Sequence, residues 1–279
     1  MNNQLPKNPP KLIASDLDGT LLDSNAALSD QNKDAVAKIV KNGTLFVPCT
    51  GRALYEITKE VRDLEGVRYL ITSNGAKITD KVTGNSIDTL ICKEDFKKIF
   101  EIMRAYAVCI TIHHDGVSYV DENLITEEKM SYFNISEYYK GHLRKTNAKM
   151  PFFNDYFEQE REVEMVCGFF KHENELRECQ EKLSKLPSLF VTASASGSIE
   201  ILSAKATKGN ALIKLSQDLG VDIKDVVAVG DSPNDLTMIR VSGLGIATAN
   251  AKDEVKAQAD RIICSNNEHV ADYLLKELF

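Results

Sequence analysis

The chain of 279 residues is long enough for one large domain or two moderate ones, and its 43% hydrophobic and 27% charged residues exclude wholesale disorder. The formal net charge of −7 argues against a nucleic-acid-binding surface, and no apolar run approaches the roughly 18 residues of a membrane span. The N-terminus is polar without an apolar signal core, and the six cysteines are scattered without a zinc-type pattern. We therefore expect a cytoplasmic protein with reduced thiols.

Short apolar runs near both ends of the chain predict strands buried on both faces of a parallel sheet. These runs cover residues 12–14, 45–47, 69–71, 226–229, 244–247 and 261–264. Helical patterns separate them, one over about 53–64 and one that carries Leu212, Leu215 and Leu219 before Gly220. Strand and helix in alternation predict a doubly wound α/β domain built from both ends of the chain.

The middle of the chain follows another pattern. A helical stretch near 94–106 precedes two alternating runs joined by Asp115-Gly116, which is a strong hairpin signal. A similar set follows, with the run EMVCGFF, a helix near 174–186 and a second pair of runs flanking Ser196-Gly197. Helix plus hairpin, found twice, predicts an inserted α+β domain with an antiparallel sheet.

These two patterns give the predicted domain organisation. The core domain comprises residues 1–88 and 197–279, and the inserted domain comprises residues 89–196. Residues 132–157 of the insert are dense in Tyr and Phe. Packing within the insert is the favoured interpretation of these aromatic residues, and contact with a substrate is the alternative.

Polar residues follow four of the apolar runs of the predicted core. They are Asp16-Leu17-Asp18-Gly19-Thr20, Thr50-Gly51-Arg52, Ser73-Asn74-Gly75 and Asp231-Ser232-Pro233-Asn234-Asp235. Each group alone is also typical of a turn or a helix cap. Because the carboxyl ends of parallel strands meet at one edge of a sheet, their joint placement predicts a single site there.

The charges of these groups indicate what the site binds. Asp16, Asp18, Asp231 and Asp235 would repel one another at close range, and a divalent cation with oxygen ligands relieves that repulsion. Mg²⁺ typically takes one or two carboxylates together with phosphate oxygens. An anionic substrate also requires a positively charged side chain in the site. The two candidates are Lys208, which opens a predicted helix, and Lys205 in the same loop.

At this point the sequence resembles a known family. The motifs DLDGTLL, TGR, SNGA, the Lys208-Gly209 pair and GDSPND are similar to the motif series of the haloacid dehalogenase superfamily, more narrowly its Cof-type, sugar-phosphatase-like branch. The resemblance covers nearly the whole chain. It implies a Rossmann-like three-layer core with a parallel sheet and a C2-type α+β cap domain inserted after the third strand.

Two stretches depart from the family pattern. Ala247–Ala251 lacks the usual Met-Gly before Asn-Ala, and residues 266–270 lack the customary glycine before the valine. Both are expected near the rim of the core, so they bear on substrate contacts more than on the chemistry.

The resemblance also assigns roles to residues. Asp16 would be a covalent nucleophile, and Asp18 the general acid and base. Mg²⁺ would be held by the Asp16 carboxylate, the Asp18 backbone carbonyl and Asp231, with Asp235 positioning Lys208 or a metal-bound water. The residues that would hold the phosphoryl group are Leu17, Thr50, Gly51, Lys208 and Asn234.

Five other residues receive a less definite role or none. Arg52 is left open between a substrate contact and an ion pair with a nearby carboxylate. Asn74 and Gly75 are expected to shape the floor of the site beneath the cap. His113 and His114, which flank the predicted hairpin turn, are left out of the site.

The predicted function is a Mg²⁺-dependent phosphatase acting on small phosphorylated metabolites through an aspartyl-phosphate. Sugar phosphates are the leading substrate class, and nucleotides, pyridoxal phosphate and flavin mononucleotide stay open. A phosphomutase using the same aspartate is the alternative enzyme. A non-catalytic binding module is disfavoured because Asp16, Asp18, Lys208 and Asp231 are all present. We expect a small phosphate ester as partner, no nucleic acid or membrane, and a monomer or weak homo-oligomer.

Overall fold

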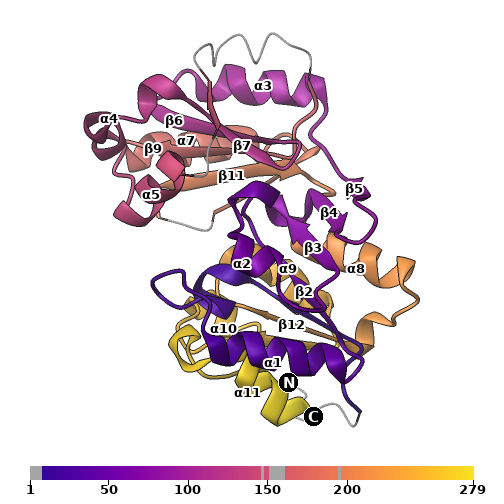
Figure 1. Cartoon of the computed structure of the whole chain (residues 1–279). Coiled ribbons are helices and arrows are strands. Elements are labelled where there is room, and N and C mark those ends of the chain that lie inside the picture. Colours follow the sequence, from indigo (N-terminus) through magenta and orange to yellow (C-terminus); the bar gives the residue numbers. More distant parts are fainter. Residues whose placement is uncertain (1–7, 146–147, 151–160, 194–195) are drawn as a thin grey trace. The chain divides into compact units, whose positions relative to one another are not determined.

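The computed structural model describes residues 8–145, 148–150, 161–193 and 196–279, and its chain divides into two compact units (Figure 1). The first unit comprises residues 1–51, 57–87 and 207–279, and the second comprises 52–56 and 88–206. The first unit contains β1 (Leu12–Ser15), α1 (Asp30–Lys41), β2 (Leu45–Pro48), α2 (Lys59–Arg62), β3 (Tyr69–Thr72), β4 (Lys77–Asp80), β5 (Ser86–Asp88, at its boundary), α8 (Lys208–Asp218), β12 (Val226–Gly230), α9 (Leu236–Val241), β13 (Leu244–Ala247), α10 (Asp253–Lys256), β14 (Arg261–Ile262) and α11 (Val270–Leu278).

The sheet of the first unit has five parallel strands in the order β14-β13-β12-β1-β2. Strand β1 from the N-terminal segment lies between β2 and β12, so both ends of the chain build one sheet, as the sequence predicts. Strand β3 follows β2 through a parallel bridge between Cys49 and Ile71 and then forms an antiparallel sheet with β4 and β5.

Both faces of this sheet are covered. Leu12 and Ala14 of β1 pack with Leu212 and Leu215 of α8 and with Met238 of α9 in one apolar cluster. Neighbouring residues of a strand point to opposite faces, and Ile13 and Ser15 are fully buried as well. Helices α1 and α11 pack against each other, with α1 also against β2. The predicted α/β core with a parallel sheet is confirmed.

The second unit is the predicted insert, with an antiparallel sheet and helices. Its elements are α3 (Lys93–Met103), β6 (Val108–His114), β7 (Val117–Asp121), α4 (Glu127–Tyr132), α5 (Glu137–Lys145), β8 (Ala148–Met150), β9 (Met165–Phe170), α7 (Glu173–Leu183), β10 (Leu189–Thr192) and β11 (Ser198–Ser203). The strand order is β10-β11-β9-β6-β7-β8, antiparallel except for the pair β7–β8.

Both predicted hairpins of this unit are present. Strands β6 and β7 pair across Asp115 and Gly116, whose positive φ angles of 49° and 75° are those of a tight hairpin turn. Strands β10 and β11 form the second antiparallel pair. Residues of α3 and α7, among them Phe96 and Leu176, share one apolar cluster with Ile112 of β6.

The segment over residues 53–64 differs from its prediction. The expected continuous helix is wrong: Leu54–Glu56 form a single 3-10 turn, and α2 begins only at Lys59. The Tyr55 N–H donates to the carbonyl of Gly116, and the Glu56 carboxylate accepts from the N–H of Ala53. These bonds hold the first turn in the second unit, so the apolar spacing does not continue as one helix.

The second unit also reaches further along the chain than residues 89–196. It runs to Ala206, because β11 pairs with both β9 and β10. The expected boundary at 196/197 therefore falls directly before a strand of its sheet.

Part of the aromatic-rich stretch lies outside the described residues, namely 146–147 and 151–160. Of the described part, Phe133 is buried in an apolar cluster with Val120 and Phe169, and Tyr139 packs against that cluster. This agrees with packing inside the insert. The six cysteines all lie in described parts of the chain and are free thiols. No helix in the described ranges is both long and apolar enough to cross a membrane.

Candidate active site

Two acidic residues of the site follow neighbouring strands at the centre of the parallel sheet. Asp16 follows β1, Asp231 follows β12, and these strands are direct neighbours. The Asp16 N–H donates to the carbonyl of Val229 at 3.0 Å, which continues the strand pairing up to Asp16. The carboxyl groups thus reach the same sheet edge, as the sequence predicts.

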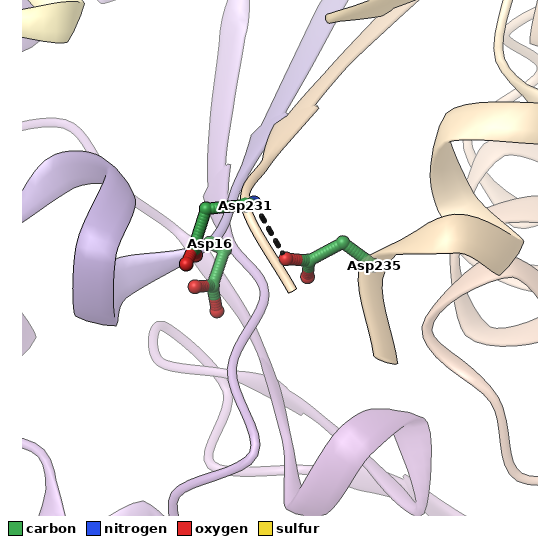
Figure 2. A group of neighbouring side chains, drawn as sticks. All are labelled: Asp16, Asp231 and Asp235. Atoms are coloured by element: carbon green, nitrogen blue, oxygen red, sulfur yellow. Dashed lines mark hydrogen bonds between the residues drawn. The ribbon is translucent and has the colours of Figure 1, made fainter. Parts of the chain in front are cut away.

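A third carboxylate joins them. One oxygen each of Asp16, Asp231 and Asp235 lies within 4.8 Å of the others (Figure 2). Asp235 is fully buried, and its Oδ2 accepts hydrogen bonds from the backbone N–H groups of Asp231 and Ser232, both at 2.9 Å. Its Oδ1 accepts from Lys208, so both of its oxygens already have partners within the protein.

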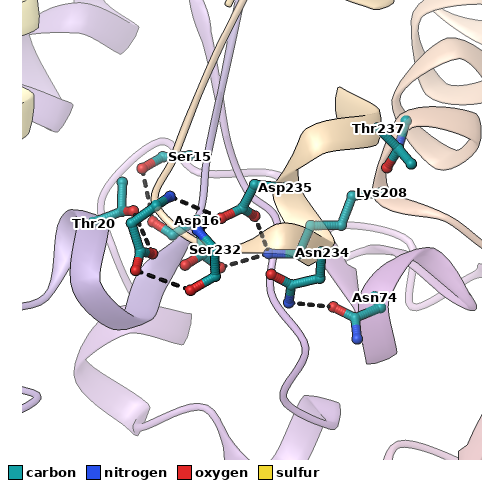
Figure 3. Close-up of polar contacts among 11 residues, drawn as sticks. Ser15, Asp16, Thr20, Asn74, Lys208, Ser232, Asn234, Asp235 and Thr237 are labelled. Carbon is teal, nitrogen blue, oxygen red and sulfur yellow. Dashed lines mark hydrogen bonds and ion pairs between the residues drawn. The ribbon is translucent and has the colours of Figure 1, made fainter. Parts of the chain in front are cut away.

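The ammonium of Lys208 lies between two of these carboxylates. Its Nζ is 2.7 Å from Asp16 Oδ1 and 2.6 Å from Asp235 Oδ1, and the residue is only 1% exposed (Figure 3). Lys208 is the first residue of α8, capped by the Thr207 side chain. Lys205 is exposed, so Lys208 is the lysine brought to the carboxylates.

Gly209 explains why the Lys-Gly pair is needed at this position. A Cβ atom there would lie 2.5 Å from the carbonyl oxygen of Thr237. Instead, the Gly209 N–H donates to Thr237 Oγ1 at 3.0 Å. The glycine lets the start of α8 approach the start of α9 closely, and this holds Lys208 beside Asp235.

The electrostatics of the cluster follow from burial and like charge. Burial raises the pKa of Asp16 well above its usual value; Lys208 opposes this, and Asp235, Asp231 and Asp18 add to it. Burial, followed by Asp235, raises the pKa of Asp231 to about 6. Burial by itself would lower the pKa of Lys208, but Asp16 and Asp235 outweigh it and hold that pKa well above its usual value.

These groups fit a divalent cation. The ligands on offer are carboxylate oxygens, which Mg²⁺ prefers, and the single ammonium of Lys208 does not balance the four nearby carboxyl groups of Asp16, Asp18, Asp231 and Asp235. The negative charge of Asp235, second to burial, contributes to the raised pKa of Asp231. Asp235 is bound by the Lys208 ammonium and two backbone N–H groups, whereas the oxygens of Asp231 accept only from the hydroxyls of Thr20 and Ser232. Hydroxyls can turn away from an incoming cation, so Asp231 has a greater capacity for a metal than Asp235.

The loop that joins Asp16 to Thr20 passes directly over Asp231. The Thr20 hydroxyl donates to Asp231 Oδ1 at 3.2 Å. Gly19 has a φ of 76°, and a Cβ atom there would lie 2.6 Å from Asp231 Oδ2. Only glycine allows both this left-handed conformation and this approach, so the DxDGT motif needs it for packing. Asp18 lies in the loop between Asp16 and Gly19.

A group of amides and hydroxyls from other strand ends adjoins the cluster. Asn234, next to Asp235, donates through Nδ2 to Asn74 Oδ1 at 2.9 Å. The Asn74 N–H donates to the carbonyl of Thr50, and a Cβ atom on Gly51 would lie 3.1 Å from Asn74 Oδ1. Thr50, Gly51, Asn74 and Asn234 therefore lie together, and Asn234 Oδ1 is buried without a hydrogen bond.

Comparison with known proteins identifies the family of this chain. A family model for haloacid dehalogenase-like hydrolases matches residues 13–274. This chain belongs to the haloacid dehalogenase-like hydrolase family. The inserted α+β unit agrees with the Cof-type branch, and the protein is a phosphatase of this superfamily.

Two curated relatives come from Bacillus subtilis (strain 168). The 5-amino-6-(5-phospho-D-ribitylamino)uracil phosphatase YwtE is 30% identical over 281 residues, which cover 96% of this chain and 98% of the relative. Phosphatase YwpJ is 27% identical over 283 residues, which cover 96% of this chain and 99% of the relative.

Solved structures of the family have the same fold. A haloacid dehalogenase-like hydrolase from B. subtilis aligns with a TM-score of 0.84 at 27% identity, covering 96% of this chain and all of the other. The subclass IIB sugar phosphatase BT4131 aligns with a TM-score of 0.80 at 20% identity, covering 95% and 98% of the two chains. At 20% identity, the likeness to BT4131 supports a shared fold and nothing further.

Not every residue considered for this phosphatase lies in the cluster. Arg52 belongs to the second unit and donates to the carbonyl of Glu56. Leu17 is fully buried beside Asp16. Sequence reasoning gave no role to the side chains of Thr20 and Ser232, which both donate to Asp231. Their positions inside the DxDGT and GDSPND motifs were the available signal.

Proposed function

We propose that this phosphatase is a Mg²⁺-dependent phosphohydrolase that forms an aspartyl-phosphate on Asp16. One observation carries the proposal: Lys208 holds Asp16 Oδ1 at 2.7 Å, while Oδ2 accepts no hydrogen bond from any described residue. A carboxylate with one oxygen fixed beside a cation and the other available is suited to attack a phosphorus atom.

The proposed reaction has two displacements. In the first, an oxygen of Asp16 bonds to phosphorus while the bond from phosphorus to the ester oxygen breaks, and Asp18 gives its proton to that oxygen. In the second, Asp18 takes a proton from a water as the water oxygen bonds to phosphorus and the Asp16–phosphorus bond breaks. The products are an alcohol and inorganic phosphate, and both aspartates return to their starting states.

Binding of the phosphoryl group is assigned to the cations and amides around Asp16. Lys208 supplies positive charge, and Leu17, Thr50, Gly51 and Asn234 supply further contacts. Asn234 uses one of its two amide N–H groups on Asn74. The other is suited to a phosphoryl oxygen.

Mg²⁺ would be held by the Asp16 carboxylate, the Asp18 backbone carbonyl and Asp231, with Asp235 as a supporting residue. When bound, it would neutralise the charge between the phosphoryl group and the carboxylates. The ion pair of Asp235 with Lys208 and its two bonds from backbone N–H groups support its place outside the ligand set.

Small phosphorylated metabolites are the proposed substrates, with sugar phosphates the leading class. YwtE, 30% identical, is named for a phosphoribityl compound, and a phosphorylated polyol chain is chemically close to a sugar phosphate. We further propose that the second unit acts as a cap domain that selects the leaving group.

A phosphate-release screen over metabolite esters with Mg²⁺ tests this proposal, with Asp16→Asn as the blank. The substitution keeps the side-chain volume and removes the nucleophile, so turnover should fall by about 10⁴-fold or more while the fold is retained. Near-normal Mg²⁺-dependent turnover in this variant would rule out Asp16 as the nucleophile. Dependence on a bisphosphorylated activator without free phosphate would instead identify a phosphomutase.

A further inference from the structure

The loop after Asp16 contains three backbone carbonyls that each accept a hydrogen bond from an asparagine side chain. Asn250 Nδ2 donates to the carbonyl of Gly19 at 2.8 Å. Asn32 Nδ2 donates to Leu21 at 2.8 Å, and Asn266 Nδ2 donates to Leu22 at 3.0 Å. We call Asn32, Asn250 and Asn266 the amide brace.

The three asparagines are themselves fixed in place. Asn250 Oδ1 accepts from the N–H of Asn266 at 2.8 Å, and Asn32 Oδ1 accepts from the N–H of Ala271, at the start of α11, at 2.9 Å. Asn32 and Asn266 are buried, at 2% and 4% exposure. The amides of Asn32 and Asn250 thus donate to the loop and accept from the chain that follows β13, and Asn266 is tied to Asn250 through its backbone N–H.

An asparagine amide that donates one hydrogen bond and accepts another is held in a fixed orientation. A side-chain amide that bonds at both its oxygen and its nitrogen has one orientation that satisfies both. A loop without regular secondary structure otherwise has carbonyls that rotate freely or bind water. Here Asp18 and Gly19 have non-helical backbone angles inside the segment Leu17–Leu21, so side chains must supply the hydrogen bonds that a regular helix would supply.

The Gly19 carbonyl is the contact nearest to the proposed chemistry. Gly19 follows Asp18 directly, and its hydrogen bond to Asn250 lies one residue before the bond from Thr20 to Asp231. The loop is therefore held from two sides immediately after Asp18. Thr248 Oγ1 lies 3.5 Å from the same carbonyl and adds a longer contact.

We propose that the amide brace, and Asn250 above all, is a positioning device for Asp18 in leaving-group protonation. The inference rests on the proposed function, in which Asp18 gives its proton to the ester oxygen. It also assigns a role to the two stretches that depart from the family pattern, Ala247–Ala251 and residues 266–270. Both hold the catalytic loop through its backbone.

The identity of the leaving group separates this role from a general structural one. An alkoxide leaving group, as in a sugar phosphate, needs a proton as its bond to phosphorus breaks. The 4-nitrophenolate of 4-nitrophenyl phosphate is stable as an anion and needs none. A misplaced Asp18 therefore lowers kcat/KM, which reports the first displacement, selectively for the sugar phosphate. A damaged nucleophile or metal site lowers kcat/KM for both esters.

Asn250→Asp is the sharpest variant, because the shape and the acceptor for Asn266 are kept while the donor to Gly19 is replaced by a repelling oxygen. Asn250 is exposed, so folding is not at risk. We expect kcat/KM for the best sugar phosphate of the screen to fall by about 10-fold or more, since displacement of a catalytic group by about 1 Å can cost 10²-fold. For 4-nitrophenyl phosphate, kcat/KM should fall by less than about 3-fold.

Asn267→Asp is the matched control. Asn267 is the neighbouring asparagine and also binds the N-terminal segment, but at Ser24, beyond the catalytic loop. It should leave the ratio of the two kcat/KM values unchanged. Asn250→Ala, which removes both hydrogen bonds, should repeat the selective loss.

An equal loss on both esters, or no loss on either, in Asn250→Asp would overturn the positioning role while leaving the proposed function intact. A wild-type chain that releases phosphate from no ester would overturn the proposed function, and the inference with it. Comparing wild type, Asp16→Asn and Asn250→Asp on both esters therefore separates the two failures.

Discussion

Lys208 and Asp16 are 192 residues apart in the chain, and their ammonium and carboxylate meet at 2.7 Å in an almost fully buried site. The contact forms because β1 and the start of α8 reach the same edge of the sheet. A second carboxylate, Asp235, takes the same ammonium at 2.6 Å. Removal of the ammonium would thus leave two buried carboxylates without a positively charged partner.

Lys208→Met tests this relationship. We expect the free energy of unfolding to fall by about 3–5 kcal/mol, because breaking a buried ion pair leaves an uncompensated charge. Turnover should fall by about 10²- to 10³-fold through lost stabilisation of the phosphoryl group. Chemical denaturation and phosphate release measure the two effects. Lys205→Met should resemble wild type, and the opposite pattern would assign the role to Lys205.

The stability of the metal-free protein should depend on pH through Asp231. Its pKa of about 6 lies above that of an unfolded aspartate, near 3.9, so the folded chain binds the additional proton between these values. Stability without metal should therefore fall as the pH rises from about 4 to about 6.

Mg²⁺ should reverse that trend, since it competes with the proton for Asp231. The rise in melting temperature on adding Mg²⁺ should be small at about pH 5 and larger at about pH 7.5. Thermal unfolding in Mg²⁺ and in EDTA at both pH values measures it. Asp231→Asn should lose most of the Mg²⁺ effect at both values. A Mg²⁺ effect in this variant equal to that of wild type would remove Asp231 from the metal site.

Gly230→Ala tests the close approach beneath the cluster. An added Cβ would lie 2.4 Å from Asp235 Cγ, so the carboxylate would have to move away from Lys208 and from the two backbone N–H groups. We expect a loss of about 1–3 kcal/mol in the free energy of unfolding, as for other overpacked sites.

The turnover of Gly230→Ala should fall together with its free energy of unfolding. Gly141→Ala on α5 is the control, because nothing lies within 4 Å of the added Cβ and alanine favours a helix. Its stability should be unchanged or slightly higher. A Gly230→Ala variant as stable and active as wild type would show that Asp235 is not held as tightly as its contacts imply.

Features that depend on a local pattern of residues could be predicted from the sequence. Apolar runs ending in DLDGT and GDSPND fixed strands β1 and β12 and the acidic residues after them, because parallel strands bring their carboxyl ends to one edge. Asp115-Gly116 fixed a hairpin, because few residues adopt positive φ angles in succession.

Contacts between side chains far apart in the sequence could not be predicted in this way, because they depend on the packing of the folded chain. The expected helix over residues 53–64 is interrupted because the Tyr55 N–H donates to the carbonyl of Gly116. Helical spacing of apolar residues does not reveal such a contact. Burial against Asp16 and Asp235 identifies Lys208, and not Lys205, as the lysine of the site.

Asn32, Asn250 and Asn266 belong to no recognisable sequence pattern, since a hydrogen bond from a side-chain amide to a distant carbonyl depends on three-dimensional proximity. The physical reason is the same throughout: residue type and spacing fix local conformation, but partners far apart in sequence are chosen by packing.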